Sequence, residues 1–138
     1  MRLLGIDFGL KRIGVAVAET EVGVATAHAS ILASGTLRKD AEAIARLAAK
    51  YETDEIVFGV PVNAQDDKME RICRTVADAL RSLGQVVHTI DESLTTVEAE
   101  RTLHADGLTV RRVKDMKDGE AARILLIRHM ESYGAAKA

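Results

Sequence analysis

Three extended apolar segments occupy the start of the chain, and the connections between them are too short for a crossover helix. Residues 2–8 are mostly apolar, residues 13–19 alternate Ile and Val with Gly and Ala, and a third segment covers about residues 24–33. Parallel strands need a connection of a dozen or more residues, whereas antiparallel strands need only a turn. We therefore predict an antiparallel meander of three strands.

The rest of the chain alternates between helical and extended periods. Apolar residues recur at helical spacing in four stretches, at residues 37–51, 69–83, 95–106 and 118–133. Short apolar strands are predicted at residues 55–60 and 85–90. The order βββαβαβαα predicts an α/β fold, with one mixed five-stranded sheet flanked by helices in a single domain over residues 1–138.

Composition narrows the classes of partner and compartment. The formal net charge is −2, so no molecule-wide field attracts nucleic acid and any phosphate contact must come from a local patch. Cys73 has no second cysteine with which to form an internal disulfide and is predicted to be a thiol of the core. A carboxylate at Asp7 precedes any apolar signal core, and no run reaches the ~18 apolar residues of a membrane span. We expect a cytoplasmic protein without a membrane partner.

An aspartate interrupts the first apolar strand. Asp7 stands between Ile6 and Phe8 in a strand expected to be covered on both faces, where an unpaired charge is costly. Three explanations remain open from this segment: a salt bridge to Arg or Lys, a turn-forming carboxylate that caps Gly9, and a metal ligand.

Three more acidic residues favour the metal explanation. Asp91 and Glu92 follow the predicted strand at residues 85–90, and the carboxyl ends of strands in an open α/β sheet usually hold the ligand site. Asp118 stands where the last helix is predicted to begin, a position at which Asp is also an ordinary N-cap. Clustered carboxylates repel one another and raise each other's pKa values unless a cation neutralises them.

The expected cation is Mg²⁺ or Mn²⁺, because both prefer oxygen ligands and the sequence has no His or Cys pair at zinc spacing. The four histidines are scattered and are expected to be structural or surface residues: His28, His88, His104 and His129. Two such ions ~3.5–4 Å apart support phosphodiester hydrolysis. We therefore take Asp7, Asp91, Glu92 and Asp118 as candidate metal ligands.

Two groups of basic residues are candidates for nucleic-acid binding. The first lies in the expected connection before Asp118 and consists of Arg111, Arg112, Lys114 and Lys117. The second is Lys11 and Arg12, just after Gly9. Basic residues beside a metal site would bring phosphate to the ions, although charged loops and turns are also common without any function. Aromatic content is only 3%, so we expect recognition of backbone and shape more than base stacking.

Several motifs in fixed order resemble one known family. They are Gly5-Ile6-Asp7-Phe8-Gly9 with residues 11–17, then residues 57–63, residues 91–99 and residues 118–122. This set is similar to the YqgF family of pre-16S rRNA nucleases, which is related to Holliday junction resolvases. Two departures stand out, since Ser93 occupies a position where the family usually has Arg and residues 64–68 lack the family's Gly.

The resemblance implies a ribonuclease H-like fold with catalytic residues Asp7, Glu92 and Asp118, which bind metal, and with Asp91 as a neighbouring metal ligand. It also implies a metal-dependent nuclease that acts on structured RNA, such as the 5′ end of pre-16S rRNA in the pre-ribosomal small subunit, or on branched DNA. Monomer and homodimer both remain open.

Two other functions compete with the nuclease. An ATP-binding protein of the actin and sugar-kinase kind also has an Asp and a Gly in its first hairpin, but it needs two domains, for which 138 residues leave no room. A non-catalytic ribosome-assembly factor could keep the fold without cutting, although retention of all three acids argues against it.

Overall fold

The computed structural model describes residues 1–62, 65–92 and 110–137, and in the last of these segments it describes side chains for residues 119–132. The strands are β1 (Arg2–Phe8), β2 (Arg12–Glu19), β3 (Val24–Leu32), β4 (Glu55–Val60) and β5 (Val87–Asp91). The helices are α1 (Leu37–Lys50), α2 (Lys68–Ser82) and α4 (Val110–Lys137). The helix predicted at residues 95–106 lies outside the described residues.

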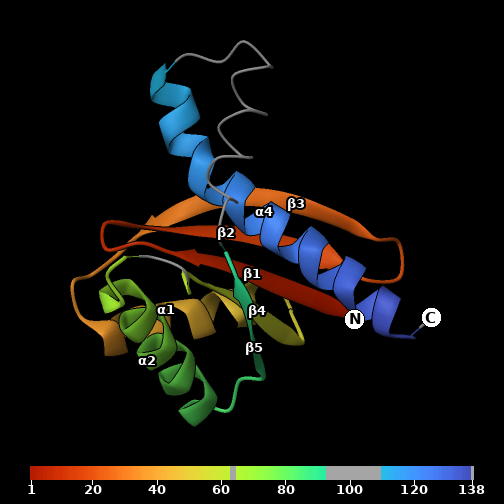
Figure 1. Ribbon diagram of the computed structural model, residues 1–138, viewed down its shortest axis with the longest axis horizontal. Helices are drawn as coiled ribbons and strands as arrows, with labels where there is room; N and C mark the ends of the chain where they lie inside the picture. The colour runs from red at the N-terminus through yellow and green to blue at the C-terminus, as the bar shows by residue number, and fades with distance from the viewer. Residues whose placement is uncertain (63–64, 93–109, 138) are drawn as a thin grey trace.

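The five strands form one mixed sheet in the order β3-β2-β1-β4-β5 (Figure 1). β1 pairs antiparallel with β2, and β2 antiparallel with β3, which confirms the predicted meander. β1 pairs parallel with β4, and β4 parallel with β5. The carboxyl ends of β1, β4 and β5 therefore meet at one edge of the sheet.

Helices cover both faces of this sheet (Figure 1). On one face α1 and α2 pack over a core that includes Leu4, Ile6 and Phe8 of β1. Cys73 of α2 is fully buried in this core, as predicted. On the other face Ala122 and Leu126 of α4 pack against a second cluster, which includes residues of β1, β2 and β4. Side chains alternate along a strand, so Asp7 faces the same side as α4.

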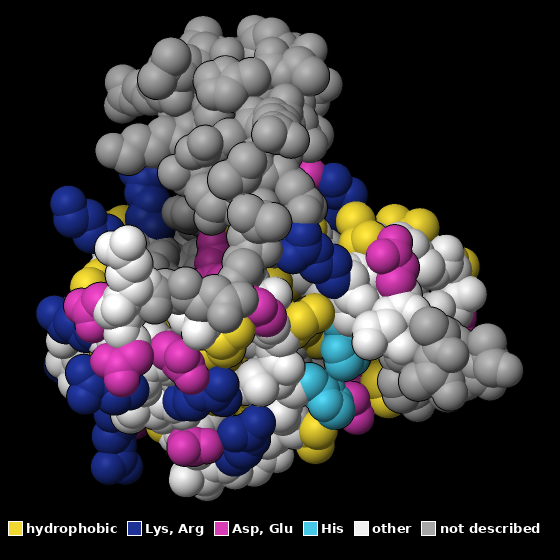
Figure 2. Space-filling view, in the orientation of Figure 1, with side chains coloured by type: hydrophobic (Ala, Val, Ile, Leu, Met, Phe, Trp, Pro, Cys, Tyr) yellow, Lys and Arg dark blue, Asp and Glu magenta, His cyan; other side chains and the backbone are white. Residues whose placement is uncertain are grey.

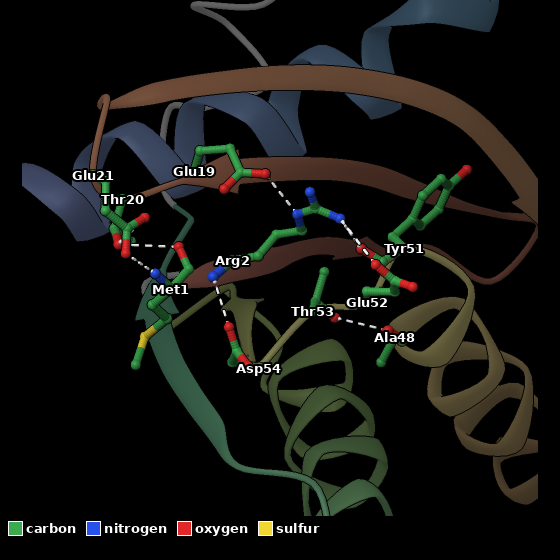
Figure 3. Close-up of polar contacts among 10 residues, drawn as sticks. All are labelled: Met1, Arg2, Glu19, Thr20, Glu21, Ala48, Tyr51, Glu52, Thr53 and Asp54. Atoms are coloured by element: carbon green, nitrogen blue, oxygen red, sulfur yellow. Dashed lines mark hydrogen bonds and ion pairs between the residues drawn. The ribbon is translucent and has the colours of Figure 1, made fainter.

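An arginine network ties together the edge of the sheet opposite to Asp7 (Figure 3). Arg2 Nε donates to Glu19 Oε1 at 2.6 Å, and Arg2 Nη1 donates to the Tyr51 carbonyl oxygen at 2.7 Å. The backbone N–H of Arg2 donates to Asp54 Oδ2 at 2.8 Å. These bonds join the start of β1 to the end of β2 and to the connection between α1 and β4. The acidic residues at this edge thus have a structural role.

The last helix starts earlier than the sequence predicted. α4 begins at Val110, so Asp118 lies inside the helix and is not its N-cap, and the basic run before it is helical and not a connection. The first turns project beyond the sheet (Figure 1), and their basic run is one that also fits a charged connection, so composition alone did not mark them as helical. Gly119 is tolerated within the helix because a Cβ there would lie 2.9 Å from the His28 carbonyl oxygen.

Within the described part of the chain, no helix is both long and apolar enough to cross a membrane.

Candidate active site

Two of the predicted acidic segments reach the same edge of the sheet. Asp7 is the penultimate residue of β1, and Asp91 is the last residue of β5, where it pairs with Val60. The backbone N–H of Glu92 donates to the Val60 carbonyl oxygen at 3.1 Å, which holds Glu92 just beyond the end of β5. Because β1, β4 and β5 are parallel, these residues all lie at their carboxyl ends.

The Glu92 side chain lies over the middle strand of the three. β4 separates β1 from β5, and neighbouring strands are ~4.8 Å apart, so Glu92 must cross β4 to reach Asp7. A Cβ on Gly59 of β4 would lie 2.7 Å from Glu92 Oε2 and 3.2 Å from Glu92 Cβ. A hydrogen bond joins the side chains of Glu92 and Asp7. The structure therefore brings together two of the three predicted catalytic carboxylates.

The surroundings favour the protonated form of Glu92. Burial raises the pKa of Glu92 to about 9, and the hydrogen bond with Asp7 and the charges of Asp7 and Asp91 act in the same direction. Without a cation, Glu92 therefore favours its protonated form at neutral pH. A divalent cation beside the pair would reverse this preference, because it stabilises both ionised carboxylates.

Cys73 lies in α2, on the face of the sheet opposite to the one that Asp7 faces, and its thiol is unreactive. Burial raises the pKa of the Cys73 thiol to about 12, and the charges of Glu92 and Asp7 contribute in the same direction. The thiolate is the form that attacks substrates and binds metals, and it is suppressed here. Cys73 is therefore a packing residue.

Of the two remaining predicted ligands, Asp91 lies at this edge of the sheet, and Asp118 lies in α4 where the helix packs over β2 and β3. Asp91 is exposed, and its charge acts on Glu92. Gly119 packs near the carbonyl oxygens of His28 and Val15, and Val15 pairs with Ile6, the neighbour of Asp7 in β1. The backbone of Asp118 therefore lies near the part of β2 that pairs with the last residues of β1. Its side chain is outside the described residues.

The described side chains include part of the predicted set of metal ligands. Among them, no group of three or more His, Cys, Asp and Glu residues is arranged to hold a metal ion. The part that is described is the hydrogen-bonded pair of Asp7 and Glu92. Two adjacent carboxyl groups give the hard oxygen donors that suit Mg²⁺ or Mn²⁺, so the residues present fit the predicted ions.

The turn between β1 and β2, which follows Asp7 in the sequence, contains two of the predicted phosphate contacts, Lys11 and Arg12. Lys11 is exposed and Arg12 is half-buried. The Gly9 N–H donates to the Arg12 carbonyl oxygen at 2.9 Å, and the Ala33 N–H donates to the Lys11 carbonyl oxygen at 2.9 Å. Backbone groups therefore close the turn and fix it to the segment after β3, so closure does not require the Asp7 carboxylate.

The other predicted phosphate contacts lie on the projecting turns of α4, and their side chains are outside the description: Arg111, Arg112, Lys114 and Lys117. On the face shown in Figure 2, the described Lys and Arg side chains are interspersed with Asp and Glu. This mixture matches the small net charge of −2 and favours local phosphate contacts over a broad basic surface.

The described histidines make structural contacts, as expected. His88 Nε2 lies 2.7 Å from Glu55 Oε1, and the His88 ring lies 5.1 Å from that of His129. The His28 ring lies 4.6 Å from that of Tyr51, at the end of α1. Glu55 and His88 lie near the starts of β4 and β5, at the opposite end of these strands from Glu92.

Sequence reasoning did not single out Gly59. A glycine inside the apolar run Ile56-Val57-Phe58-Gly59-Val60 weakens a strand, so it often marks a place where another group approaches the backbone closely. That signal was available in the sequence, but the group that approaches, Glu92, is 33 residues further along the chain.

A family model described as RuvX, Holliday junction resolvase, matches residues 1–132. The chain belongs to this family. A relative from Anaeromyxobacter sp. (strain K), named "Putative pre-16S rRNA nuclease", is 38% identical over 129 residues, which cover 91% of this chain and 93% of the relative. A relative of the same name from Syntrophus aciditrophicus is 32% identical, and the match covers 99% of this chain and 93% of the relative. These matches confirm the resemblance to the YqgF family.

Solved structures of Holliday junction resolvases share the fold. The Thermus thermophilus RuvC bound to a Holliday junction substrate matches with a TM-score of 0.62 at 12% identity, covering 97% of this chain and 96% of that one. The fowlpox virus resolvase in complex with Holliday junction DNA matches with a TM-score of 0.61 at 13% identity, covering 96% and 99%. At such low identity these matches show the fold alone, and they confirm the predicted ribonuclease H-like class.

Proposed function

We propose that this protein is a metal-dependent nuclease that hydrolyses phosphodiester bonds in structured nucleic acid. The observation that carries the proposal is the pair formed by Asp7 and Glu92, joined by a hydrogen bond at the carboxyl edge of the sheet. Membership of a family described as Holliday junction resolvase supports the same class of reaction. Asp118 is the third proposed catalytic residue.

The ions that suit this site are Mg²⁺ or Mn²⁺, in our proposal two of them. Asp7, Glu92 and Asp118 would hold them, with Asp91 as an additional ligand. Bound ions of this kind activate a water molecule and stabilise the leaving oxygen. The contribution of the chain is to hold the carboxylates in place and, at Glu92, to give up the carboxyl proton when a cation arrives.

Basic residues around this edge would position the phosphate backbone. Lys11 and Arg12 belong to a turn that starts two residues after Asp7 and is closed by backbone hydrogen bonds. Arg111, Arg112, Lys114 and Lys117 lie on the turns of α4 that project beyond the sheet, just before Asp118. A scissile phosphate held between these two groups would lie beside the acidic pair.

Lys11→Gln is expected to weaken nucleic-acid binding without changing the fold, because the exposed side chain would contribute one phosphate contact. In filter-binding titrations over a series of salt concentrations, the slope of log K against log salt should become less steep by about one unit. Lys50→Gln, an exposed lysine at the last residue of α1, is the matched control and should keep the wild-type slope. Identical slopes for all three proteins would remove Lys11 from the binding surface.

For the substrate we propose structured RNA at the 5′ end of pre-16S rRNA, with branched DNA as the second candidate. The names of the relatives favour the first, and the family description favours the second. Both substrates present phosphate backbones of defined shape. A chain with 3% aromatic residues and no tryptophan has few platforms for base stacking, so it is better suited to such shapes than to single-stranded bases.

Cleavage of labelled RNA and DNA tests this function directly. A pre-16S rRNA fragment with its 5′ stem and a four-way DNA junction would each be incubated with the protein and Mg²⁺, Mn²⁺ or EDTA. We expect cleavage with either metal and none with EDTA, and faster cleavage of the RNA. The cleavage products should carry new ends inside the structured region.

Two outcomes would favour the competing functions. RNA binding at low salt without cleavage under any metal condition would favour a non-catalytic ribosome-assembly factor. ATP hydrolysis without nucleic-acid cleavage would favour an ATP-binding protein of the actin kind.

A further inference from the structure

The strand that lies between the two acidic residues has a gap, which here means a position without a side chain, at Gly59. β4 runs between β1, which carries Asp7, and β5, which leads to Glu92. The other residues from Ile56 to Val60 have side chains and are buried. Only at Gly59 does a strand residue of this run lack a side chain, and the Glu92 carboxyl group lies over that position.

We propose that Gly59 is a positioning residue for Glu92, because its missing side chain leaves the passage across β4 through which the Glu92 carboxylate reaches Asp7. This inference rests on the metal site proposed above. The distance that carries it is the 2.7 Å between a Cβ built on Gly59 and Glu92 Oε2, where no real Cβ could sit without displacing that oxygen.

A second glycine under the same helix shows what is special about this gap. A Cβ on Gly5 of β1 would lie 2.8 Å from the Ala122 carbonyl oxygen and 2.7 Å from Leu126 Cγ, so the gap at Gly5 is occupied by α4 itself. The gap at Gly59 is shared between Leu125 Cδ1, also at 2.7 Å, and the carboxyl group of Glu92. Gly5 thus accommodates helix packing, whereas Gly59 also accommodates a functional side chain.

The two neighbours of Gly59 determine how the protein would respond to an added methyl group. Glu92 Oε2 and Leu125 Cδ1 are both outer atoms of flexible side chains, and no backbone atom is among the three nearest atoms. Rotation of these side chains therefore relieves the two closest contacts of Gly59→Ala, and a shift of a few tenths of an ångström relieves the third, at 3.2 Å from Glu92 Cβ. The backbone fold should persist, but the Glu92 carboxylate should move away from Asp7.

The test measures Mn²⁺ binding to the full chain with no nucleic acid present, by calorimetric titration, and melting temperatures are measured separately in EDTA. We expect Gly59→Ala to raise the Mn²⁺ concentration for half-maximal binding by about tenfold, the size of effect typical when a group that orients a metal ligand is lost. Gly84→Ala is the matched control, because Gly84 has φ +87° in open space and its substitution strains the chain without touching the site. It should lower the melting temperature and leave the Mn²⁺ midpoint unchanged.

A double variant distinguishes the effects of the two side chains that the added methyl group would contact. Leu125→Val removes the Cδ1 atom, so Gly59→Ala combined with Leu125→Val keeps only the collision with Glu92. We expect this double variant to bind Mn²⁺ as weakly as Gly59→Ala alone, and Leu125→Val alone to bind as the wild type does.

Each other outcome has a definite meaning. A wild-type midpoint for Gly59→Ala, or recovery of that midpoint in the double variant, would overturn the role of Gly59 while leaving the metal site in place. Absence of any Mn²⁺ binding by the wild-type protein would overturn the proposed metal site and this inference with it.

Discussion

Asp7→Asn is expected to lower the rate of metal-dependent cleavage by about 100-fold or more, because it removes a carboxylate that would bind the ions. The amide has nearly the same shape as the carboxylate and can still form a hydrogen bond with Glu92. The substitution also removes a charge that raises the pKa of Glu92, so it relieves repulsion within the pair. The variant should therefore fold as well as the wild type and fail only in cleavage, measured as single-turnover rates with Mn²⁺.

Asp54→Asn provides the matched control for this substitution. Asp54 accepts a hydrogen bond from the Arg2 backbone N–H at the opposite edge of the sheet (Figure 3), and an Asn side-chain oxygen can accept the same bond. We expect wild-type cleavage from this variant. Equal cleavage by the wild type and Asp7→Asn would remove the proposed mechanism.

Glu92→Gln is expected to make the metal-free protein more stable at neutral and mildly basic pH while abolishing cleavage. Gln is close in shape to a protonated Glu. Its amide can donate a hydrogen bond to Asp7 at every pH, whereas Glu92 can donate one only while it is protonated. The gain should be at least on the order of 2 kcal/mol in the free energy of unfolding near pH 8, since one pKa unit corresponds to about 1.4 kcal/mol and the pKa of Glu92 is raised by several units.

The sign of this effect follows from the direction of the pKa shift. The pKa of Glu92 is raised from 4.5 to about 9 in the folded protein, so between these values the folded state keeps a proton that the unfolded chain has lost. The contribution of Glu92 to the unfolding free energy of the metal-free wild type should therefore be fully present below about pH 4.5. It should be lost as the pH rises towards 9. Glu92→Gln cannot titrate and should lack this decline.

Urea unfolding in EDTA between pH 5 and 9 measures both curves. The difference in unfolding free energy between variant and wild type should grow with pH across this range. Glu120→Gln is a useful comparison, because Glu120 is also buried but is paired with Arg123 in α4. That substitution should destabilise the protein. A pH-independent difference between Glu92→Gln and the wild type would contradict the raised pKa of Glu92.

Most of the fold follows from local patterns in the sequence. The meander at the start of the chain was predictable because short connections exclude a parallel crossover, and β4 was predictable because its apolar run ends at Pro61. The start of α4 was not predicted, because Asp118 is a favoured N-cap residue and the basic run before it also fits a charged connection, although Val110, Val113 and Met116 recur at helical spacing.

The candidate site was predictable in part for a related reason. Asp7 and Glu92 are conspicuous because each places a charge at the end of an apolar strand. Their contact depends on the order of strands in the sheet and on the gap at Gly59 between them, which are tertiary properties. The raised pKa of Glu92 depends on burial and on the neighbouring acids, so it too emerges only once the chain is folded.

Calorimetric titration of Mn²⁺ into the wild type, Asp7→Asn and Glu92→Gln at about pH 7.5 tests the central claim that the acidic pair is a metal site. Repeating each titration in two buffers with different ionisation enthalpies gives the number of protons released. We predict that the wild type binds Mn²⁺ and releases about one proton from Glu92, and that both variants bind at least about tenfold more weakly. Equal affinity in all three proteins, with no proton released by the wild type, would contradict the account.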